Sequence, residues 1–249
     1  MDLPLPCFLG LGTQKGGTTS LHDLLLRHPR VFLPPCKEVH YFSLHYARGL
    51  DWYAEQFAAA APHQRCGDIT PYYLFHPEAP ARIQSLLPEA RMIVLLRDPV
   101  ERALSGVFHS QRLGLEPLPL AEALAAEPGR LAGADERLGC PGGVDLSHQV
   151  HSYVSRSRYE QQLERFERHV ARNQLLLVRS EDLFADPEPV WCQVLGFLGL
   201  DPWPLPEGLG RSNAGGGEAA EVDGALREQL REQLRPTYAA MAQRYGITW

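Results

Sequence analysis

The residues best suited to chemistry form a glycine-rich turn with one lysine near the start of the chain. An apolar stretch from Cys7 to Leu11 leads into Gly12-Thr13-Gln14-Lys15-Gly16-Gly17-Thr18-Thr19-Ser20. Glycines let the chain turn tightly and approach a ligand without a Cβ clash. The free N–H groups of a first helical turn and the helix dipole then favour an anion. The pattern predicts a site for a phosphate or phosphosulfate ester, formed by Lys15, Gly16, Gly17, Thr18, Thr19 and Ser20.

The order of residues in this turn separates two kinds of phosphate loop. Nucleotide triphosphatases place the lysine after the last glycine, in the pattern G-x-x-x-x-G-K-[ST]. Here Lys15 precedes the glycine pair and Thr18 follows it. The triphosphatase pattern therefore fits poorly. A glycine-rich turn without a ligand is the plainer alternative, but it does not account for a lysine, two glycines and three hydroxyls at one helix start.

A second candidate for anion binding follows the clearest buried strand, residues 91–96. Arg97 comes at the carboxyl end of that strand, and ligands of open α/β sheets bind at this edge. Asp98 and Pro99 are typical of a helix start. Ser105 lies about two turns into that helix. One guanidinium fork and one hydroxyl can hold a phosphate by charge-assisted hydrogen bonds, although Arg97 can also pair with a nearby acid.

Candidate proton acceptors lie in the segment Lys37-Glu38-Val39-His40-Tyr41-Phe42. Glu38 and His40 are both suited to general-base catalysis. Aromatic neighbours can desolvate a carboxylate and raise its pKa, which favours Glu38. A purely structural role for both residues remains the alternative.

Strand and helix patterns alternate along the chain, which predicts an α/β fold with a parallel sheet and helices on its faces. The strands are expected at 8–11, 31–33 and 174–178 besides 91–96, with a strand end at 67–71. Helices are expected at 18–27, 53–61, 77–87, 98–113, 158–172 and 189–198, and at 222–245 with a possible break at Pro236. Residues 115–143 are expected as loop, short helix (120–126) and loop. With no linker or internal repeat, residues 1–249 are expected to form one domain.

Composition limits the class of partner. The chain has 249 residues, 44% of them hydrophobic, which is ample for a core. A net charge of −6 gives no global basic field for nucleic acid or an anionic membrane surface. The five cysteines are widely spread and form no C-x-x-C pair, which favours a reducing compartment over a disulfide framework or zinc site. Without a signal-peptide pattern or long apolar run, we expect a cytoplasmic protein without a membrane span.

The Lys15 turn, the pair Arg97 and Ser105, and the segment 37–42 together resemble the sulfotransferases that use 3′-phosphoadenosine 5′-phosphosulfate (PAPS). The similarity is strongest to the branch of heparan sulfate sulfotransferases and bacterial relatives. There K-G-G-T binds the 5′-phosphosulfate, an arginine and a serine eight positions later bind the 3′-phosphate, and [N/K]-E-x-H-[FY]-F holds the base. The resemblance covers nearly the whole chain and implies a P-loop-like, three-layer α/β/α fold with a central, mainly parallel sheet.

The same resemblance implies a role for each matched residue. Lys15 would stabilise the leaving phosphate, and Arg97 with Ser105 would hold the 3′-phosphate. Glu38 would be the general base, and His40 is the reserve candidate because the small-molecule branch of the family uses a histidine. The implied reaction is sulfuryl transfer from PAPS to an acceptor hydroxyl, leaving 3′,5′-bisphosphoadenosine (PAP). No metal is implied.

Two departures from the heparan sulfate branch reduce positive charge. Ile69 stands where many of those enzymes have the lysine of E-K-T-P, and the late K-G-R-x-H-P loop is absent, with Arg211-Ser212-Asn213 in roughly that region. Both changes favour a hydroxyl-bearing small molecule or another glycan over a heparan-type polyanion. The sequence names neither the acceptor nor an oligomeric state.

Two other functions stay open. A P-loop kinase would need a lysine after the glycines and an acidic magnesium ligand after a buried strand, where Asp98 is better explained as a helix cap. A non-catalytic nucleotide-binding module would keep both phosphate motifs and need no base.

Overall fold

The computed structural model describes residues 4–140, 142–208 and 221–249. The described residues group into two compact units, one from residues 4–96 and 165–208 and the other from residues 97–140, 142–164 and 221–249. The two units are described one at a time below. The expectation of one domain over residues 1–249 stays a prediction.

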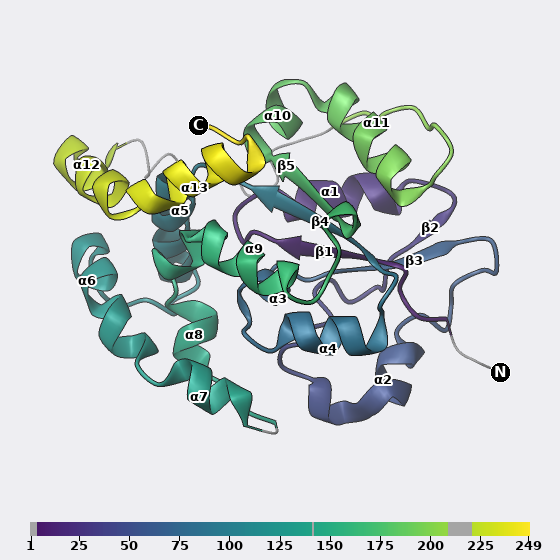
Figure 1. The fold of residues 1–249 in the computed structure, drawn as a ribbon, viewed down its shortest axis with the longest axis horizontal. Coiled ribbons are helices and arrows are strands. Elements are labelled where there is room, and N and C mark those ends of the chain that lie inside the picture. Colours follow the sequence, from purple (N-terminus) through teal and green to yellow (C-terminus); the bar gives the residue numbers. More distant parts are fainter. Residues whose placement is uncertain (1–3, 141, 209–220) are drawn as a thin grey trace. The chain divides into compact units, whose positions relative to one another are not determined.

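The first unit is built on a five-stranded sheet in the order β2-β3-β1-β4-β5 (Figure 1). All of its strand pairs are parallel. The strands are β1 (Phe8–Gly12), β2 (Val31–Phe32), β3 (Arg65–Ile69), β4 (Arg91–Leu96) and β5 (Leu175–Arg179). The predicted parallel sheet is confirmed. Uninterrupted apolar runs are typical of strands that are covered on both faces, and β4 is buried along nearly its whole length.

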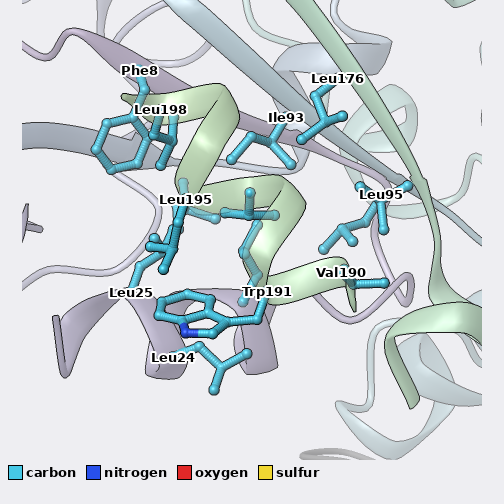
Figure 2. Packing of buried hydrophobic residues seen from close by; sticks show 14 of the residues in the cluster. Phe8, Leu24, Leu25, Ile93, Leu95, Leu176, Val190, Trp191, Leu195 and Leu198 are labelled. Carbon is cyan, nitrogen blue, oxygen red and sulfur yellow. The ribbon is translucent and has the colours of Figure 1, made fainter. Parts of the chain in front are cut away.

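Helices cover both faces of this sheet, as the predicted three-layer α/β/α fold requires (Figure 1). On one face, α1 (Thr18–Leu26) and α11 (Pro187–Leu198) pack leucines and Trp191 against Phe8, Ile93 and Leu95, as Figure 2 shows. On the other face lie α3 (Tyr72–Phe75) and α4 (Ala79–Leu86). The remaining elements of this unit are η1 (Tyr46–Arg48), α2 (Gly49–Glu55), η3 (Arg172–Gln174) and α10 (Ser180–Ala185).

The second unit is helical. It contains α5 (Pro99–Arg112), α6 (Leu120–Leu131), α7 (Ala134–Gly139), α8 (Leu146–Val150), η2 (Ser155–Ser157), α12 (Gly224–Gln233) and α13 (Arg235–Tyr245). Helix α9 (Tyr159–Glu167) begins in this unit and ends in the first. Asp98 caps α5 as expected, since its carboxylate accepts a hydrogen bond from the Glu101 N–H at 3.0 Å.

Four expected elements differ from the structure. The helix expected at 158–172 ends earlier, at Glu167. Residues 115–143 hold two helices instead of one short helix, because Pro128 is accommodated within α6 and the chain continues helical to Leu131. The expected helix at 53–61 begins earlier, at Gly49, and ends at Glu55. The expected break in the last helix occurs at Leu234, just before the Pro236 turn of α13. The glycine-rich stretch 211–217 lies outside the described residues.

No helix in the described ranges is long and apolar enough to cross a membrane.

The pairing of β1 with β3 depends on a missing side chain. Phe8 lies directly opposite Gly67, and its ring occupies the space that a side chain at Gly67 would need. A Cβ on Gly67 would lie 2.1 Å from the ring atom Cζ of Phe8. This contact places a large aromatic residue in the sheet core at the strand pair that leads into the Lys15 turn.

A buried carboxylate lies near the carboxyl end of β3. Asp68 is fully buried, and it accepts hydrogen bonds from Thr70 Oγ1 at 2.7 Å, Tyr73 Oη at 2.7 Å and Tyr53 Oη at 3.1 Å. Burial raises the pKa of Asp68 above its usual value, while the three hydroxyl donors and the nearby His40 act in the opposite direction. The network holds α2, β3 and the start of α3 together, and it orients Thr70.

Replacing Gly67 with alanine should destabilise the protein by roughly 1–3 kcal/mol or more, because the new methyl group overlaps the Phe8 ring in a close-packed core. Urea denaturation measures this loss. In a Phe8→Leu background the same substitution should cost less. The control Gly196→Ala, in α11 with open space around it, should be neutral or slightly stabilising. Equal effects of Gly67→Ala in both backgrounds would contradict the contact.

The Asp68→Asn variant should change how stability depends on pH. Because the folded-state pKa of Asp68 exceeds the unfolded value of about 3.9, the folded protein holds this proton more tightly. Stability contributed by Asp68 is therefore lost as pH rises from about 4 through the folded pKa. The free energy of unfolding of wild type minus that of Asp68→Asn should fall over this range, by roughly 1.4 kcal/mol per unit of pKa difference.

Urea denaturation across this pH range, with the exposed-acid variant Glu55→Gln as control, measures the difference. A difference that grows with pH would place the folded pKa below the unfolded one and contradict the assignment.

Candidate active site

The Lys15 turn connects the carboxyl end of β1 to the start of α1. It is pinned to the neighbouring strand, since the N–H of Thr13 donates to the Leu95 carbonyl at 2.5 Å. The Gly16 N–H donates to the Thr13 carbonyl at 2.9 Å, and the Gly16 carbonyl accepts from Ser180 Oγ. A Cβ on Gly16 would lie 2.9 Å from the carbonyl oxygen of Leu95. Glycine is therefore required for the close approach of the turn to β4.

The first turn of α1 is suited to an anion. Its N-cap is Gly17, at φ 95°, which has no side chain to cap the helix, and the first turn holds no acidic residue. The N–H groups of a helix start and the helix dipole favour negative charge. The predicted hydroxyl residues fill this turn: Thr18 and Ser20 are buried and Thr19 is half-buried. Lys15 lies in the turn just before it.

A lysine that the sequence analysis left without a role links this helix start to the candidate base. Lys37 Nζ donates a hydrogen bond to Thr19 Oγ1 at 2.6 Å and lies 3.7 Å from Glu38 Oε1. The side chain of Lys37 is 29% exposed and that of Glu38 is 37% exposed. One ammonium group therefore bridges the turn predicted to bind an anion and the carboxylate. The signal in the sequence was the adjacency of Lys37 to Glu38.

His40 lies on the other side of the same carboxylate. Its Nε2 is 3.5 Å from Glu38 Oε2, and its Nδ1 is 3.1 Å from Ser43 Oγ. The backbone N–H of His40 donates to Thr70 Oγ1 at 3.4 Å, which connects this segment to the Asp68 network. The two proposed bases, Glu38 and His40, thus lie together. Glu38 is flanked by cationic and imidazole groups, whereas the neighbouring Tyr41 and Phe42 are buried in an aromatic cluster with Tyr53.

The backbone conformation is unusual at the residues predicted for catalysis. Among the described residues, the non-glycine positions with positive φ are Lys15 (69°), Glu38 (63°) and His40 (57°). Left-handed backbone at a residue with a Cβ is unfavourable, and such positions cluster at functional sites where the surrounding structure maintains them. The three residues predicted for catalysis are the three that carry this cost.

The second predicted phosphate motif lies in the second unit. Arg97 follows Leu96, the last residue of β4, and is half-buried. Its carbonyl accepts a hydrogen bond from Tyr159 Oη at 2.8 Å, and the adjacent Asp98 carboxylate accepts one from Tyr238 Oη at 2.9 Å. Ser105 is buried in α5. Two tyrosine hydroxyls therefore fix the turn that carries Arg97.

The structure thus groups Lys15, Gly16, Gly17, Thr18, Thr19, Ser20, Glu38 and His40 in the first unit, and Arg97 and Ser105 in the second. The roles of all ten residues remain predictions. Among the aromatic residues in and after the Glu38 segment, Tyr41, Phe42, Tyr72 and Tyr73 are buried in the core. Trp52 is half-buried, with the Arg48 guanidinium 4.2 Å from its ring centroid.

Comparison with known proteins identifies the family. The model of the sulfotransferase domain matches residues 7–207, which include every predicted site residue. The chain is 34% identical over 197 residues to human heparan sulfate glucosamine 3-O-sulfotransferase 3B1, a match that covers 79% of this chain and 46% of that protein. It is 42% identical over 111 residues to the membrane-associated sulfotransferase kil1 of Dictyostelium discoideum, covering 43% of this chain and 24% of that one.

The chain thus spans about half or less of the length of these curated relatives. Among solved structures, a sulfotransferase from Alicyclobacillus acidocaldarius is 26% identical and superimposes with a TM-score of 0.82, covering 99% of this chain and 98% of that one. The family match, the parallel sheet and the β1–α1 turn agree with one another: the chain belongs to the sulfotransferase domain family.

Proposed function

We propose that this protein transfers a sulfuryl group from PAPS to an acceptor hydroxyl, with Glu38 as the general base. The observation that carries the proposal is the bridge formed by Lys37, which joins the first turn of α1 to Glu38. A transferase of this kind must hold the donor's phosphosulfate and the proton acceptor side by side, because the acceptor oxygen attacks in line. The positive φ values of Lys15, Glu38 and His40 support the same assignment.

The residues of the β1–α1 turn fit the 5′-phosphosulfate of the donor. The start of α1 has no acidic residue and no capping side chain, and Lys15, Thr18 and Thr19 lie in and after the turn. When bound, the donor supplies the activated sulfuryl group. Lys15 would stabilise the charge that develops on the leaving phosphate. Arg97 and Ser105 would hold the 3′-phosphate of the same nucleotide, as the sequence motif implies.

Glu38 is suited to take the proton from the acceptor hydroxyl. Its side chain is open enough to meet an acceptor, and Lys37 and His40 flank its two oxygens. His40, held through Ser43 and Thr70, would orient the carboxylate. A base held in position near the reacting hydroxyl typically contributes about 10²–10⁴-fold to the rate.

The acceptor is proposed to be a hydroxyl-bearing small molecule or a glycan other than a heparan-type polyanion. Ile69 supports this restriction, because its side chain is buried in the core that α1 and α11 cover, so no cation is available at this position. The predicted location in a reducing, cytoplasmic compartment also stays a proposal. It is supported by the five cysteines, all of which are free thiols. Two of them lie near each other, the half-buried Cys7 just before β1 and the buried Cys66 in β3.

Nucleotide-dependent stabilisation tests the proposed donor. PAP should raise the melting temperature of the full chain, because a ligand that binds only the folded state stabilises it by about 2.7 kcal/mol at a hundredfold excess over Kd. For a protein of this size each kcal/mol shifts the melting temperature by roughly 2–4 °C, so the expected rise is roughly 5–11 °C. The Lys15→Ala variant should show a smaller shift. A larger shift with ATP and magnesium than with PAP would instead support a kinase, and no shift with PAP would contradict the proposal.

Substitution of the base tests the chemistry separately from binding. Glu38→Gln should lower kcat by roughly 10²–10⁴-fold with PAP affinity nearly unchanged, because only proton removal is lost. The assay is PAP release with a panel of phenols, alcohols and neutral glycans. The control Glu55→Gln, an exposed acid in α2, should retain full activity.

His40→Ala should be less active than wild type but more active than Glu38→Gln. A fully active Glu38→Gln with an inactive His40→Ala would make the histidine the base. A protein that binds PAP but sulfates no acceptor would be a nucleotide-binding module.

A further inference from the structure

Arg102 is a buried cation that has no role in the proposed reaction. It lies in α5 of the second unit and is fully buried. Its Nε donates to Ser157 Oγ at 2.6 Å, and its Nη2 donates to the Tyr153 carbonyl. Both acceptors are neutral. Its remaining nitrogen, Nη1, is buried and has no hydrogen-bond acceptor among the described residues.

No carboxylate in the described part of the chain lies within 4.0 Å of this guanidinium. Glu127 is near enough to act on its charge, but the oxygens of Glu127 are occupied elsewhere. They accept from the backbone N–H groups of Tyr153 at 2.9 Å, Val154 at 2.7 Å and Ser155 at 2.8 Å. A buried charge without a partner is strongly unfavourable, so its retention calls for an explanation.

The absence of a side chain at Gly106 leaves space for the guanidinium next to α5. Gly106 follows one turn after Arg102, and a Cβ there would lie 3.3 Å from Nη2 and 3.5 Å from Nη1 of Arg102. The guanidinium therefore lies against the bare backbone of α5 at Gly106, the residue that follows Ser105. Tyr153 closes the same space, since its ring atom Cδ1 would be 3.5 Å from such a Cβ.

Arg97 adds positive charge to the same neighbourhood. Burial lowers the pKa of Arg102. The nearby Tyr159 and Glu127 act in the opposite direction, and the positive charge of Arg97 lowers the pKa of Arg102 further. Arg102 N–H donates to the Asp98 carbonyl at 2.8 Å, so Arg102 lies one helical turn after the residue that follows Arg97. Two guanidiniums therefore contribute positive charge near the start of α5.

We propose that Arg102 is a positioning and specificity residue for the phosphate held by Arg97, supplying the second positive charge that a phosphomonoester dianion requires. A phosphomonoester carries about −1.5 to −2 at pH 7, which matches two cations better than one. Arg102 would act through its positive charge from a buried position in α5, without contact with the nucleotide. It would favour a nucleotide with a 3′-phosphate over one without it. This inference rests on the proposed function, because it takes the ligand at Arg97 to be the 3′-phosphate of PAPS.

The test compares two nucleotides on the full chain by calorimetry: PAP, which has the 3′-phosphate, and adenosine 5′-monophosphate, which lacks it. Arg102→Gln should weaken PAP about tenfold or more and leave the monophosphate within about twofold. Arg102→Lys, which keeps the charge, should recover most of the PAP affinity. Equal weakening of both nucleotides, or unchanged PAP affinity, would overturn the proposal.

A second pair of variants keeps the test decisive if Arg102→Gln does not fold. Ser157→Ala removes the acceptor of Arg102 Nε, and Ser152→Ala removes a buried serine whose hydroxyl instead donates to the His148 carbonyl. The first should weaken PAP several-fold and spare the monophosphate, and the second should change neither. If wild type binds PAP no better than the monophosphate, the role of Arg102 is refuted. If wild type binds neither nucleotide, the proposed function itself fails.

Discussion

The contact that the account depends on is the hydrogen bond from Lys37 Nζ to Thr19 Oγ1, made by an ammonium that also faces Glu38. It ties the start of α1, where we propose that the phosphosulfate binds, to the carboxylate proposed to take the proton. Charge-assisted contacts of this kind are short and directional, and they set the distance between the two groups that must act together. The parallel sheet makes the contact possible. In parallel strands the carboxyl ends share one edge, so the turn after β1 and the segment after β2 meet there.

Several residues of the protein carry a local energetic cost, either in backbone conformation or in the burial of a charged group. Lys15, Glu38 and His40 hold left-handed backbone, Asp68 is a buried carboxylate, and Arg102 is a buried cation. Each is supported by its surroundings: Asp68 by three hydroxyls, Arg102 by Ser157 and a backbone carbonyl. Such departures from local preference are typical of functional sites, where a fixed charge in a fixed place matters more than stability.

Some parts of the structure follow from residues that are neighbours in the sequence, and others depend on contacts between distant residues. The strands of the sheet and the capped start of α5 were predictable, because an apolar run indicates a buried strand and the pair Asp98-Pro99 is typical of a helix start. The boundaries of α2, α6 and α7 were not, since tertiary packing decides whether an alanine-rich stretch with Pro128 stays helical. The motif around Glu38 was visible, but the role of Lys37 was not, because its partner Thr19 is eighteen residues away. The buried state of Arg102 depends on Ser157 and Tyr153, which no spacing rule connects to it.

The most direct test of the central claim is a crystal structure of the full chain with PAP bound. One molecule is expected, with its 5′-phosphate at the start of α1 beside Lys15 and its 3′-phosphate at Arg97 and Ser105. A 5′-phosphate bound away from the Lys15 turn, or a 3′-phosphate held by residues other than Arg97 and Ser105, would contradict it.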